Sequence, residues 1–197
     1  MTKLLCLLGS PRADANSTTL AQRFVSTAEA EGADVQVVKL AELAFSGCRS
    51  LFHCKTAGER CGQNDDLTRV LDQIHQADIL LLASPIYFTD VSGLLKAAID
   101  RFFSFFRADY VTNPEKSRLA PGKSLVMALV QGEPETRCAD VFERYGRPFG
   151  MLGFEDRHLL RGCGLREAGA IAEHPELLAE AEHLAHRLVT ARLGTAL

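Results

Sequence analysis

Three uninterrupted apolar runs limit what this chain can fold into more than any other feature of its sequence. They occupy residues 4–8, 79–83 and 125–130. A strand with one solvated face alternates apolar and polar residues, whereas a strand buried on both faces is apolar throughout. We therefore expect these runs to be central strands of a parallel sheet that carries helices on both faces.

Amphipathic stretches fill the intervals between these runs. Apolar residues recur at helical spacing over residues 17–30, 65–74, 92–106, 136–152 and 175–193. Two further strands are predicted at residues 34–40, whose alternation is typical of a sheet edge, and at residues 154–162. Five strands alternating with five helices predict a single doubly wound α/β domain over residues 1–197 with right-handed crossovers.

The remaining segments read as loops. Residues 84–89 follow the third strand without a regular pattern, and residues 107–121 contain two prolines. Residues 41–64 also lack a clear period and hold three of the six cysteines. We expect all three segments to be irregular connections.

Composition and charge exclude several classes of protein. With 47% hydrophobic and 24% charged residues, the chain is globular, and its net charge of −3 gives no reason to expect a nucleic-acid partner. No apolar run is long enough to span a membrane, and the run after residue 3 is too short for a secretion signal. We therefore expect a cytoplasmic protein with no membrane partner, in which six cysteines do not form a disulfide framework.

The loop after the first strand has the composition of a phosphate site. It supplies Ser10 and Arg12, and Asn16, Ser17 and Thr18 follow at the predicted start of a helix. A helix N-terminus offers unpaired amide N–H groups and the positive end of the helix dipole. The alternative is an ordinary connection in which Asn16 or Ser17 caps the helix. Neither the G-x-G-x-x-G fingerprint nor a P-loop motif is present, which favours a monophosphate over a dinucleotide.

The loop after the third strand supplies aromatic surface. It contains Pro85, Ile86, Tyr87 and Phe88. In the flavodoxin-like strand order 2-1-3-4-5 the first and third strands are neighbours, so both loops border one crevice. A flat heteroaromatic ring with a phosphate tail fits this arrangement. Core packing or a dimer contact is the alternative role for Tyr87 and Phe88.

Three segments together resemble a known family. They read Gly-Ser-Pro-Arg at 9–12 with Asn-Ser-Thr at 16–18, Ser-Pro-Ile-Tyr-Phe at 84–88, and Leu-Leu-Lys-Ala-Ala-Ile-Asp-Arg-Phe at 94–102. Over residues 3–130 the chain resembles the NADPH-dependent FMN reductases. The resemblance implies a flavodoxin-like fold and non-covalent FMN, with its phosphate in the first loop and its ring on the second. It also implies a third contact from Gln131 and Gly132, and a homodimer or tetramer with the site near a subunit interface.

The same resemblance implies the activity. It predicts an FMN-dependent NAD(P)H oxidoreductase that passes electrons to a quinone, a nitro or azo compound, another flavin or a redox protein. The flavin N5 then carries the chemistry, and no side chain need be catalytic. A flavodoxin-like electron carrier or redox sensor is one alternative, and an α/β module that binds another phosphorylated ligand is a second.

The cysteine-bearing connection resembles the cluster-binding segment of the iron–sulfur flavoproteins. Cys48, Cys54 and Cys61 stand where three of that segment's four cysteines belong, and Leu51 replaces the other. Because a [4Fe–4S] cluster normally takes four thiolates, we expect no cluster and no metal site. The favoured interpretation is a cluster-free remnant that lines the flavin crevice. Redox-active thiols and a metal site at the three cysteines are the alternatives.

Overall fold

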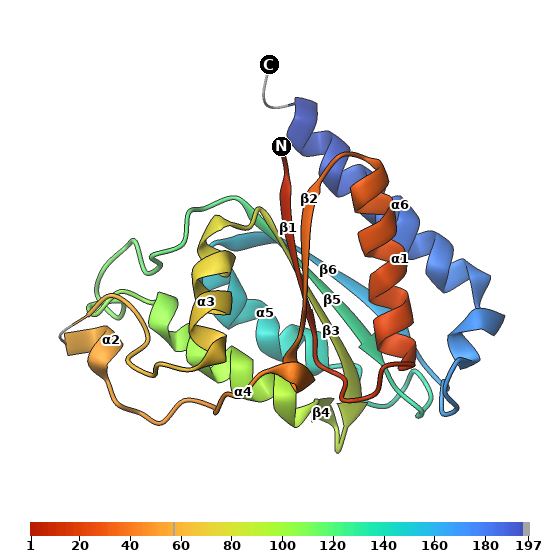
Figure 1. Cartoon of the computed structure of the whole chain (residues 1–197), viewed down its shortest axis with the longest axis horizontal. Coiled ribbons are helices and arrows are strands. Elements are labelled where there is room, and N and C mark those ends of the chain that lie inside the picture. The colour runs from red at the N-terminus through yellow and green to blue at the C-terminus, as the bar shows by residue number, and fades with distance from the viewer. Residues whose placement is uncertain (57, 195–197) are drawn as a thin grey trace.

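The computed structural model describes residues 1–56 and 58–194, and its centre is a twisted parallel sheet (Figure 1). The strands follow the order 2-1-3-5-6, which is the predicted flavodoxin-like order once the short β4 is set aside. Each pair of neighbours on this path is parallel, and β2 is the edge strand that its alternating sequence predicts. The strands are β2 (Asp34–Lys39), β1 (Lys3–Leu8), β3 (Ile79–Tyr87), β5 (Lys123–Val130) and β6 (Phe154–Gly162).

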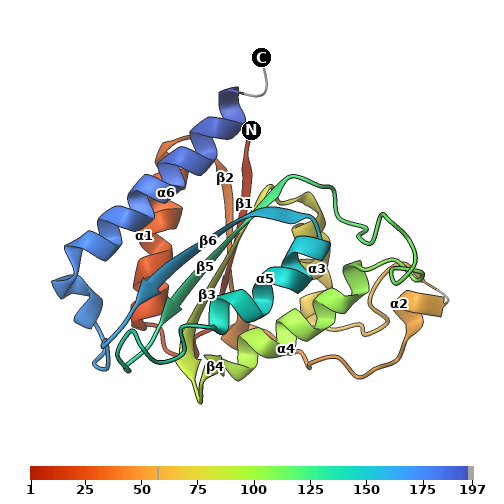
Figure 2. The same cartoon turned by 180° about the vertical axis from the view of Figure 1, so that it is seen from behind.

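Helices cover both faces of the sheet (Figures 1 and 2). On one face lie α1 (Asn16–Ala30) and α6 (Pro175–Gly194), and on the other α3 (Asp66–Gln76), α4 (Gly93–Arg101) and α5 (Val141–Met151). The short elements are α2 (His53–Thr56) and the 3₁₀ turns η1 (Leu40–Glu42), η2 (Phe102–Phe105) and η3 (Ala170–Glu173). No helix in the described ranges is long and apolar enough to cross a membrane.

The continuous apolar runs are explained by two separate cores. In β1, Leu5 and Leu7 pack into the core under α3, α4 and α5, whereas Leu4, Cys6 and Leu8 pack under α1 and α6. All five side chains are buried, so neither face of the strand tolerates a polar residue. The prediction of central strands buried on both faces is confirmed.

The loop predicted at residues 84–89 is wrong in part, because β3 continues to Tyr87. Its residues 84–85 pair with residues 129–130 of β5, and residues 86–87 pair antiparallel with β4 (Asp90–Val91). Ser84 and Pro85 hide this extension in the sequence, because neither is typical of a strand interior. The result is a β-hairpin at the carboxyl edge of the sheet.

The helix predicted at residues 136–152 begins later, at Val141. Before it, the Gln131 side chain donates hydrogen bonds to the carbonyl oxygens of Glu133, Pro134 and Arg137. These bonds hold residues 131–137 as a compact loop and delay the helix. The helix predicted at residues 92–106 likewise divides into α4, with Ser92 as its N-cap, and the turn η2.

Candidate functional site

A cleft of about 350 Å³ opens at the carboxyl ends of the central strands. The end of β3 and the segments that follow β1, β5 and β6 all contribute to its walls. This volume lies within the range of about 300–1,000 Å³ that is usual for small-molecule sites. The edge at which parallel strands end is also where ligands of open α/β sheets bind.

Backbone contacts at Gly9 lock the two predicted loops together. The Gly9 amide donates to the Ala83 carbonyl oxygen at 2.8 Å, and the Ser92 hydroxyl donates to the Gly9 carbonyl oxygen at 2.6 Å. The Ser92 amide in turn donates to the Ser84 hydroxyl at 2.9 Å. A Cβ at position 9 would lie 2.8 Å from the Leu95 Cβ, so only glycine permits this approach. The first two walls of the cleft therefore have a fixed relative position.

The start of α1 is suited to an anion. Ala15 is its N-cap residue, no side chain caps the helix, and its first turn carries no acidic residue. The alternative in which Asn16 or Ser17 caps the helix is therefore wrong. The Ser17 side chain lines the cleft, and its buried hydroxyl has no partner among the residues that the structure describes. An unpaired buried hydroxyl at an uncapped helix N-terminus needs a polar ligand, which a phosphate supplies.

The side-chain amide of Asn16 is hydrogen-bonded within the protein. Its Nδ2 donates to the Glu167 carbonyl oxygen at 2.8 Å, and its Oδ1 accepts from the Ile171 amide at 3.2 Å. These bonds join the start of α1 to the segment after β6. Asn16 lines the cleft, but its side chain serves to bring that segment to the cleft wall.

The structure brings most of the predicted binding residues together. Among them, those that line the cleft are Arg12, Asn16, Ser17, Pro85, Ile86, Tyr87 and Gly132. Four others do not line the cleft but lie within two residues of a lining residue: Ser10, Thr18, Phe88 and Gln131. Ser10 shapes the first loop, because its hydroxyl accepts from the Arg12 amide at 3.1 Å. Gln131 shapes the loop after β5, here called the third loop, through its three hydrogen bonds to that loop's carbonyl oxygens.

Sequence reasoning missed the fourth wall, which Leu165 and Arg166 form. Arg166 crosses to the third loop, where its Nε donates to the Gly132 carbonyl oxygen at 3.0 Å and its Nη2 lies 3.4 Å from the Glu133 carboxylate. A signal was present. The strand at residues 154–162 was predicted, and the segment after a parallel strand lies at the same edge as the other loops.

The hairpin beside the cleft has an unusual turn. Phe88 and Thr89 connect β3 to β4 with φ of 50° and 69°, both in the left-handed region. Two-residue hairpin turns with two positive φ values normally use Asn-Gly or Gly-Gly, because a Cβ is disfavoured there. The turn exposes aromatic surface, since Tyr87 is 46% and Phe88 fully exposed. Core packing is therefore not the role of Phe88.

The three cysteines lie elsewhere. Cys48, Cys54 and Cys61 line a separate cavity of about 50 Å³ together with Phe52 and Phe103. None of them lines the cleft, so the structure does not place the cysteine-bearing segment along it as the sequence predicts. Within residues 1–56 and 58–194, no three histidine, cysteine or acidic side chains are grouped closely enough to hold a metal ion.

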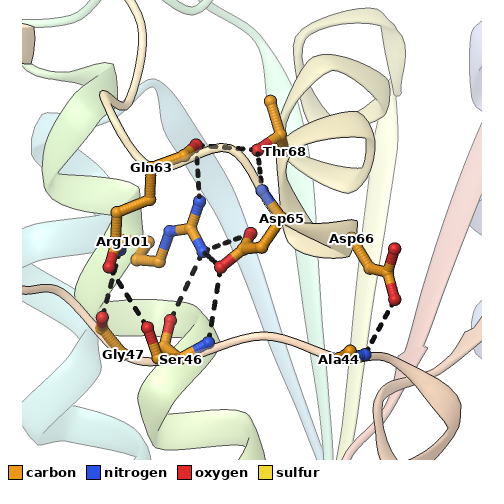
Figure 3. A network of polar contacts seen from close by, with 8 residues as sticks. All are labelled: Ala44, Ser46, Gly47, Gln63, Asp65, Asp66, Thr68 and Arg101. Atoms are coloured by element: carbon orange, nitrogen blue, oxygen red, sulfur yellow. Dashed lines mark hydrogen bonds and ion pairs between the residues drawn. The ribbon is translucent and has the colours of Figure 1, made fainter.

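A buried ion pair anchors both ends of the cysteine-bearing connection (Figure 3). The Arg101 side chain on α4 is fully buried, and its Nη1 lies 2.6 Å from the Asp65 carboxylate. The same guanidinium donates to the carbonyl oxygens of Ser46 and Gln63, at 3.3 and 3.5 Å. Asp65 also caps α3, in a capping box with Thr68. The network holds residues 46 and 63–65 against α3 and α4.

Burial and pairing act in opposite directions on Asp65. Burial raises the pKa of this carboxyl, but hydrogen bonding and attraction to Arg101 outweigh burial and hold the pKa below its usual value. The Asp65 carboxylate is therefore charged at neutral pH and compensates the buried guanidinium. A buried arginine without this partner would be costly.

Comparison with known proteins gives a family match over most of the chain. The family model described as NADPH-dependent FMN reductase matches residues 2–133. An iron-sulfur flavoprotein of Methanocaldococcus jannaschii is 33% identical over 99 residues, which are 50% of this chain and 51% of that protein. The chain thus spans about half the length of this relative.

A second relative is aligned almost from end to end. A Bacillus subtilis protein assigned as an NAD(P)H-dependent FMN-containing oxidoreductase is 26% identical over 90% of this chain and 93% of its own. Among solved structures, an FMN-dependent NADH-azoreductase of Bacillus anthracis in complex with FMN superposes with a TM-score of 0.75. That likeness has 17% identity, covers 95% of this chain and all of the other, and shows the shared fold.

Proposed function

This chain belongs to the NADPH-dependent FMN reductase family, and we propose that its cleft binds FMN for the transfer of electrons from NAD(P)H to an acceptor. The acceptor classes are a quinone, a nitro or azo compound, another flavin and a redox protein. One observation carries the placement of the cofactor. The buried, unpaired Ser17 hydroxyl lies at an uncapped helix N-terminus inside a cleft that two interlocked loops border.

The residues of the cleft fit a ring with a phosphate tail. Ser17 and the N-terminus of α1 would hold the phosphate, with Ser10 and Thr18 shaping the adjoining backbone and Arg12 adding positive charge. When bound, FMN supplies the two-electron chemistry that links a nicotinamide to an acceptor. The proposed tasks of the chain are to bind, orient and shield the cofactor.

The ring would lie against the hairpin wall. Pro85, Ile86 and Tyr87 line the cleft on that side, with Phe88 next in the chain, and Gly132, which follows Gln131, lines the cleft from the loop after β5. The amides of Phe88 and Thr89 donate to no acceptor within the described ranges, which leaves them available to a ligand. Such donors stabilise negative charge as it develops on a bound group.

A double substitution at the phosphate end tests this proposal. We expect Ser17→Asp with Thr18→Asp to abolish FMN binding, because two carboxylates would repel the phosphate. Ser26→Asp with Thr27→Asp is the matched control, since it adds the same charge to α1 at one exposed and one half-buried position that do not line the cleft. FMN is titrated into each apo protein and followed by flavin fluorescence. A double variant at 17 and 18 that still binds stoichiometric FMN would refute the phosphate site.

Ser17→Ala guards against a folding defect in the double variant. This substitution removes only the hydroxyl and introduces no charge into the buried start of α1, so it should not disturb folding. Since hydrogen bonds to charged groups contribute about 1.5–3 kcal/mol, FMN affinity should fall at least about tenfold. Anaerobic mixing of the FMN-loaded protein with NADPH then tests turnover. Rapid bleaching of the flavin supports the oxidoreductase, whereas an unbleached flavin would favour an electron carrier.

We also propose a homodimer or tetramer. Tyr87 and Phe88 expose aromatic surface at the mouth of the cleft, as a contact with a second copy would require. Light scattering on the eluting protein tests the assembly. A monomer at micromolar concentration would refute it.

No iron–sulfur cluster is part of the proposal. Leu51 replaces one of the four expected cysteines, and the remaining three do not form a metal-binding group in the described ranges. Iron and sulfide analysis of anaerobically purified protein tests this directly. Stoichiometric iron would overturn it.

A further inference from the structure

The geometry points to Arg144, Tyr145 and Asp90 as positioning residues that brace the hairpin wall of the cleft. All three lie outside the lining of the cleft, and sequence patterns gave them no role. The inference rests on the proposed function, because the braced turn is the one that would face the FMN ring.

The turn needs a brace because its backbone is strained. Phe88 and Thr89 both have positive φ, and neither is a residue that tolerates this region well. Thr89 is branched at Cβ, which makes its left-handed conformation a genuine outlier. Strain of this kind persists only where the surroundings determine the conformation, and it is concentrated at functional sites. A relaxed turn would move the exposed Phe88 and the free amides beside it.

Helix α5 supplies the restraint through two consecutive side chains. The Arg144 Nη2 donates to the Thr89 carbonyl oxygen at 2.8 Å, and the Tyr145 hydroxyl donates to the Asp90 Oδ1 at 2.8 Å. Arg144 also lies 3.4 Å from the Asp90 carboxylate and 3.2 Å from Asp140 on its own helix. The Asp90 Oδ1 further accepts from the Val91 amide. The second residue of the strained turn and the Asp90 that follows it are therefore bound to α5.

Tyr145 is a fixed donor in this arrangement. Its ring is buried and packs against Phe149, and its hydroxyl donates to Asp90. Burial raises the pKa of the Tyr145 hydroxyl, and the neighbouring Asp90 carboxylate raises it further. The hydroxyl accordingly keeps its proton throughout the range in which flavoenzymes work. Asp90 accepts the hydrogen bond from this hydroxyl and is held in place.

The brace acts on the ring through the turn. With Thr89 and Asp90 held, the conformation of the two-residue turn is set before a ligand arrives, and binding need not order its amides. N–H donors at the ring edge favour the reduced, electron-rich flavin over the oxidised one. Releasing the turn should therefore weaken FMN binding and lower the midpoint potential of the bound flavin. If these residues only stabilised the fold, their loss would leave the flavin midpoint potential unchanged. FMN affinity would then fall by no more than the loss of unfolding free energy explains.

Two variants remove the brace with little change in shape. Arg144→Met removes the guanidinium contacts to Thr89 and Asp90, and Tyr145→Phe removes only the hydroxyl. We expect each to lower FMN affinity about tenfold, since the bonds lost are charge-assisted. Each should also lower the flavin midpoint potential relative to the unmodified protein. Arg23→Met is the matched control, because it removes an exposed arginine–glutamate pair between α1 and α6, and its affinity should stay within about twofold.

A third substitution tests the strain itself. Asparagine tolerates the left-handed region better than threonine, so Thr89→Asn should relax the turn without deleting the carbonyl that Arg144 contacts. In the Thr89→Asn background, Arg144→Met should cost less than about threefold in FMN affinity. A cost equal to that in the unmodified background would overturn the role of strain.

The outcomes separate this inference from the proposed function. If the unmodified protein fails to bind FMN, the proposed function and the brace both fall. If it binds FMN and neither variant changes affinity or potential, the brace alone is refuted. An affinity loss that is matched by an equal loss of unfolding free energy in the apo protein, with an unchanged potential, marks a merely structural role and also overturns it.

Discussion

The cleft is built where strands end and α1 begins, whereas the cysteine-bearing connection is mostly irregular, and the fold holds the two regions in different ways. Each wall of the cleft lies at or shortly after the carboxyl end of a strand, and short hydrogen bonds such as that from Gly9 to Ala83 join the first two walls. The connection between η1 and α3 is far longer, and the Arg101–Asp65 ion pair holds it near its two ends. Side chains at strand ends therefore converge, whereas the three cysteines do not form a metal-binding group in the described ranges.

This difference separates a region whose geometry is set by the sheet from one whose geometry is not. In the cleft, the position of Ser17 follows from β1 and the core beneath α1, so it does not depend on a ligand. In the connection, the middle part carries its own strain, with positive φ at Ser50 and Phe52. A short loop is positioned by the strand that it follows. The middle of a long connection that is anchored only near its ends is positioned by its own local contacts.

The largest effect on stability should come from the Arg101–Asp65 ion pair, which tethers the cysteine-bearing connection. Arg101→Met leaves the Asp65 carboxylate and the carbonyl oxygens of Ser46 and Gln63 without their partner. Losing one member of a buried ion pair costs about 3–5 kcal/mol of unfolding free energy, which urea denaturation measures. We also expect faster hydrogen exchange over residues 44–65 and an FMN affinity within about twofold of the unmodified protein.

Lys96→Met is the control for that experiment. It removes an exposed pair with Asp100 on the same helix, and such pairs contribute about 0–1 kcal/mol. If Arg101→Met weakened FMN binding as much as Ser17→Ala does, the cleft and the connection would not be independent, and the comparison would fail.

A smaller effect is expected where the cleft itself is tied together. Asn16→Ala removes the hydrogen bonds to Glu167 and Ile171 that hold the fourth wall. Leaving these buried groups unpaired should cost about 1–3 kcal/mol of unfolding free energy. Unlike Arg101→Met, it should also weaken FMN binding, because Leu165 and Arg166 lose their position. Stability and affinity are measured on the same preparation, and an unchanged affinity would show that this wall does not contribute to binding.

The parts of this structure that sequence could predict are those set by periodicity and strand ends. The apolar run at β1 fixed its burial on both faces, and the polar residues that follow it marked the first wall of the cleft. The extension of β3 through Ser84 and Pro85 escaped prediction, because pairing with β5 and β4 outweighs their low strand propensity. The Asn16 and Gln131 contacts were equally invisible, since they join residues to partners that only the fold brings near.

The pH dependence of stability offers a finer test of the tether. The pKa of Asp65 is lowered in the folded protein, so its contribution is complete above the ordinary carboxyl pKa of about 3.9 and is lost as the pH falls through the folded pKa. Asp65→Asn keeps the side-chain shape but does not titrate. Between about pH 6 and pH 3, the unmodified protein should therefore lose more unfolding free energy than the variant. Parallel curves would mean that the Asp65 charge does not hold the connection.

The smallest effect should come from the cysteines. Cys48→Ser, Cys54→Ser and Cys61→Ser combined should leave FMN affinity within about twofold, because their cavity shares no lining residue with the cleft. The cost in unfolding free energy should stay near about 1 kcal/mol, since none of the three side chains is fully buried. Fluorescence titration beside Ser17→Ala, which should lose at least about tenfold in affinity, gives the contrast. A triple variant that lost its flavin would show that the connection reaches the cofactor, and the two regions would then form one site.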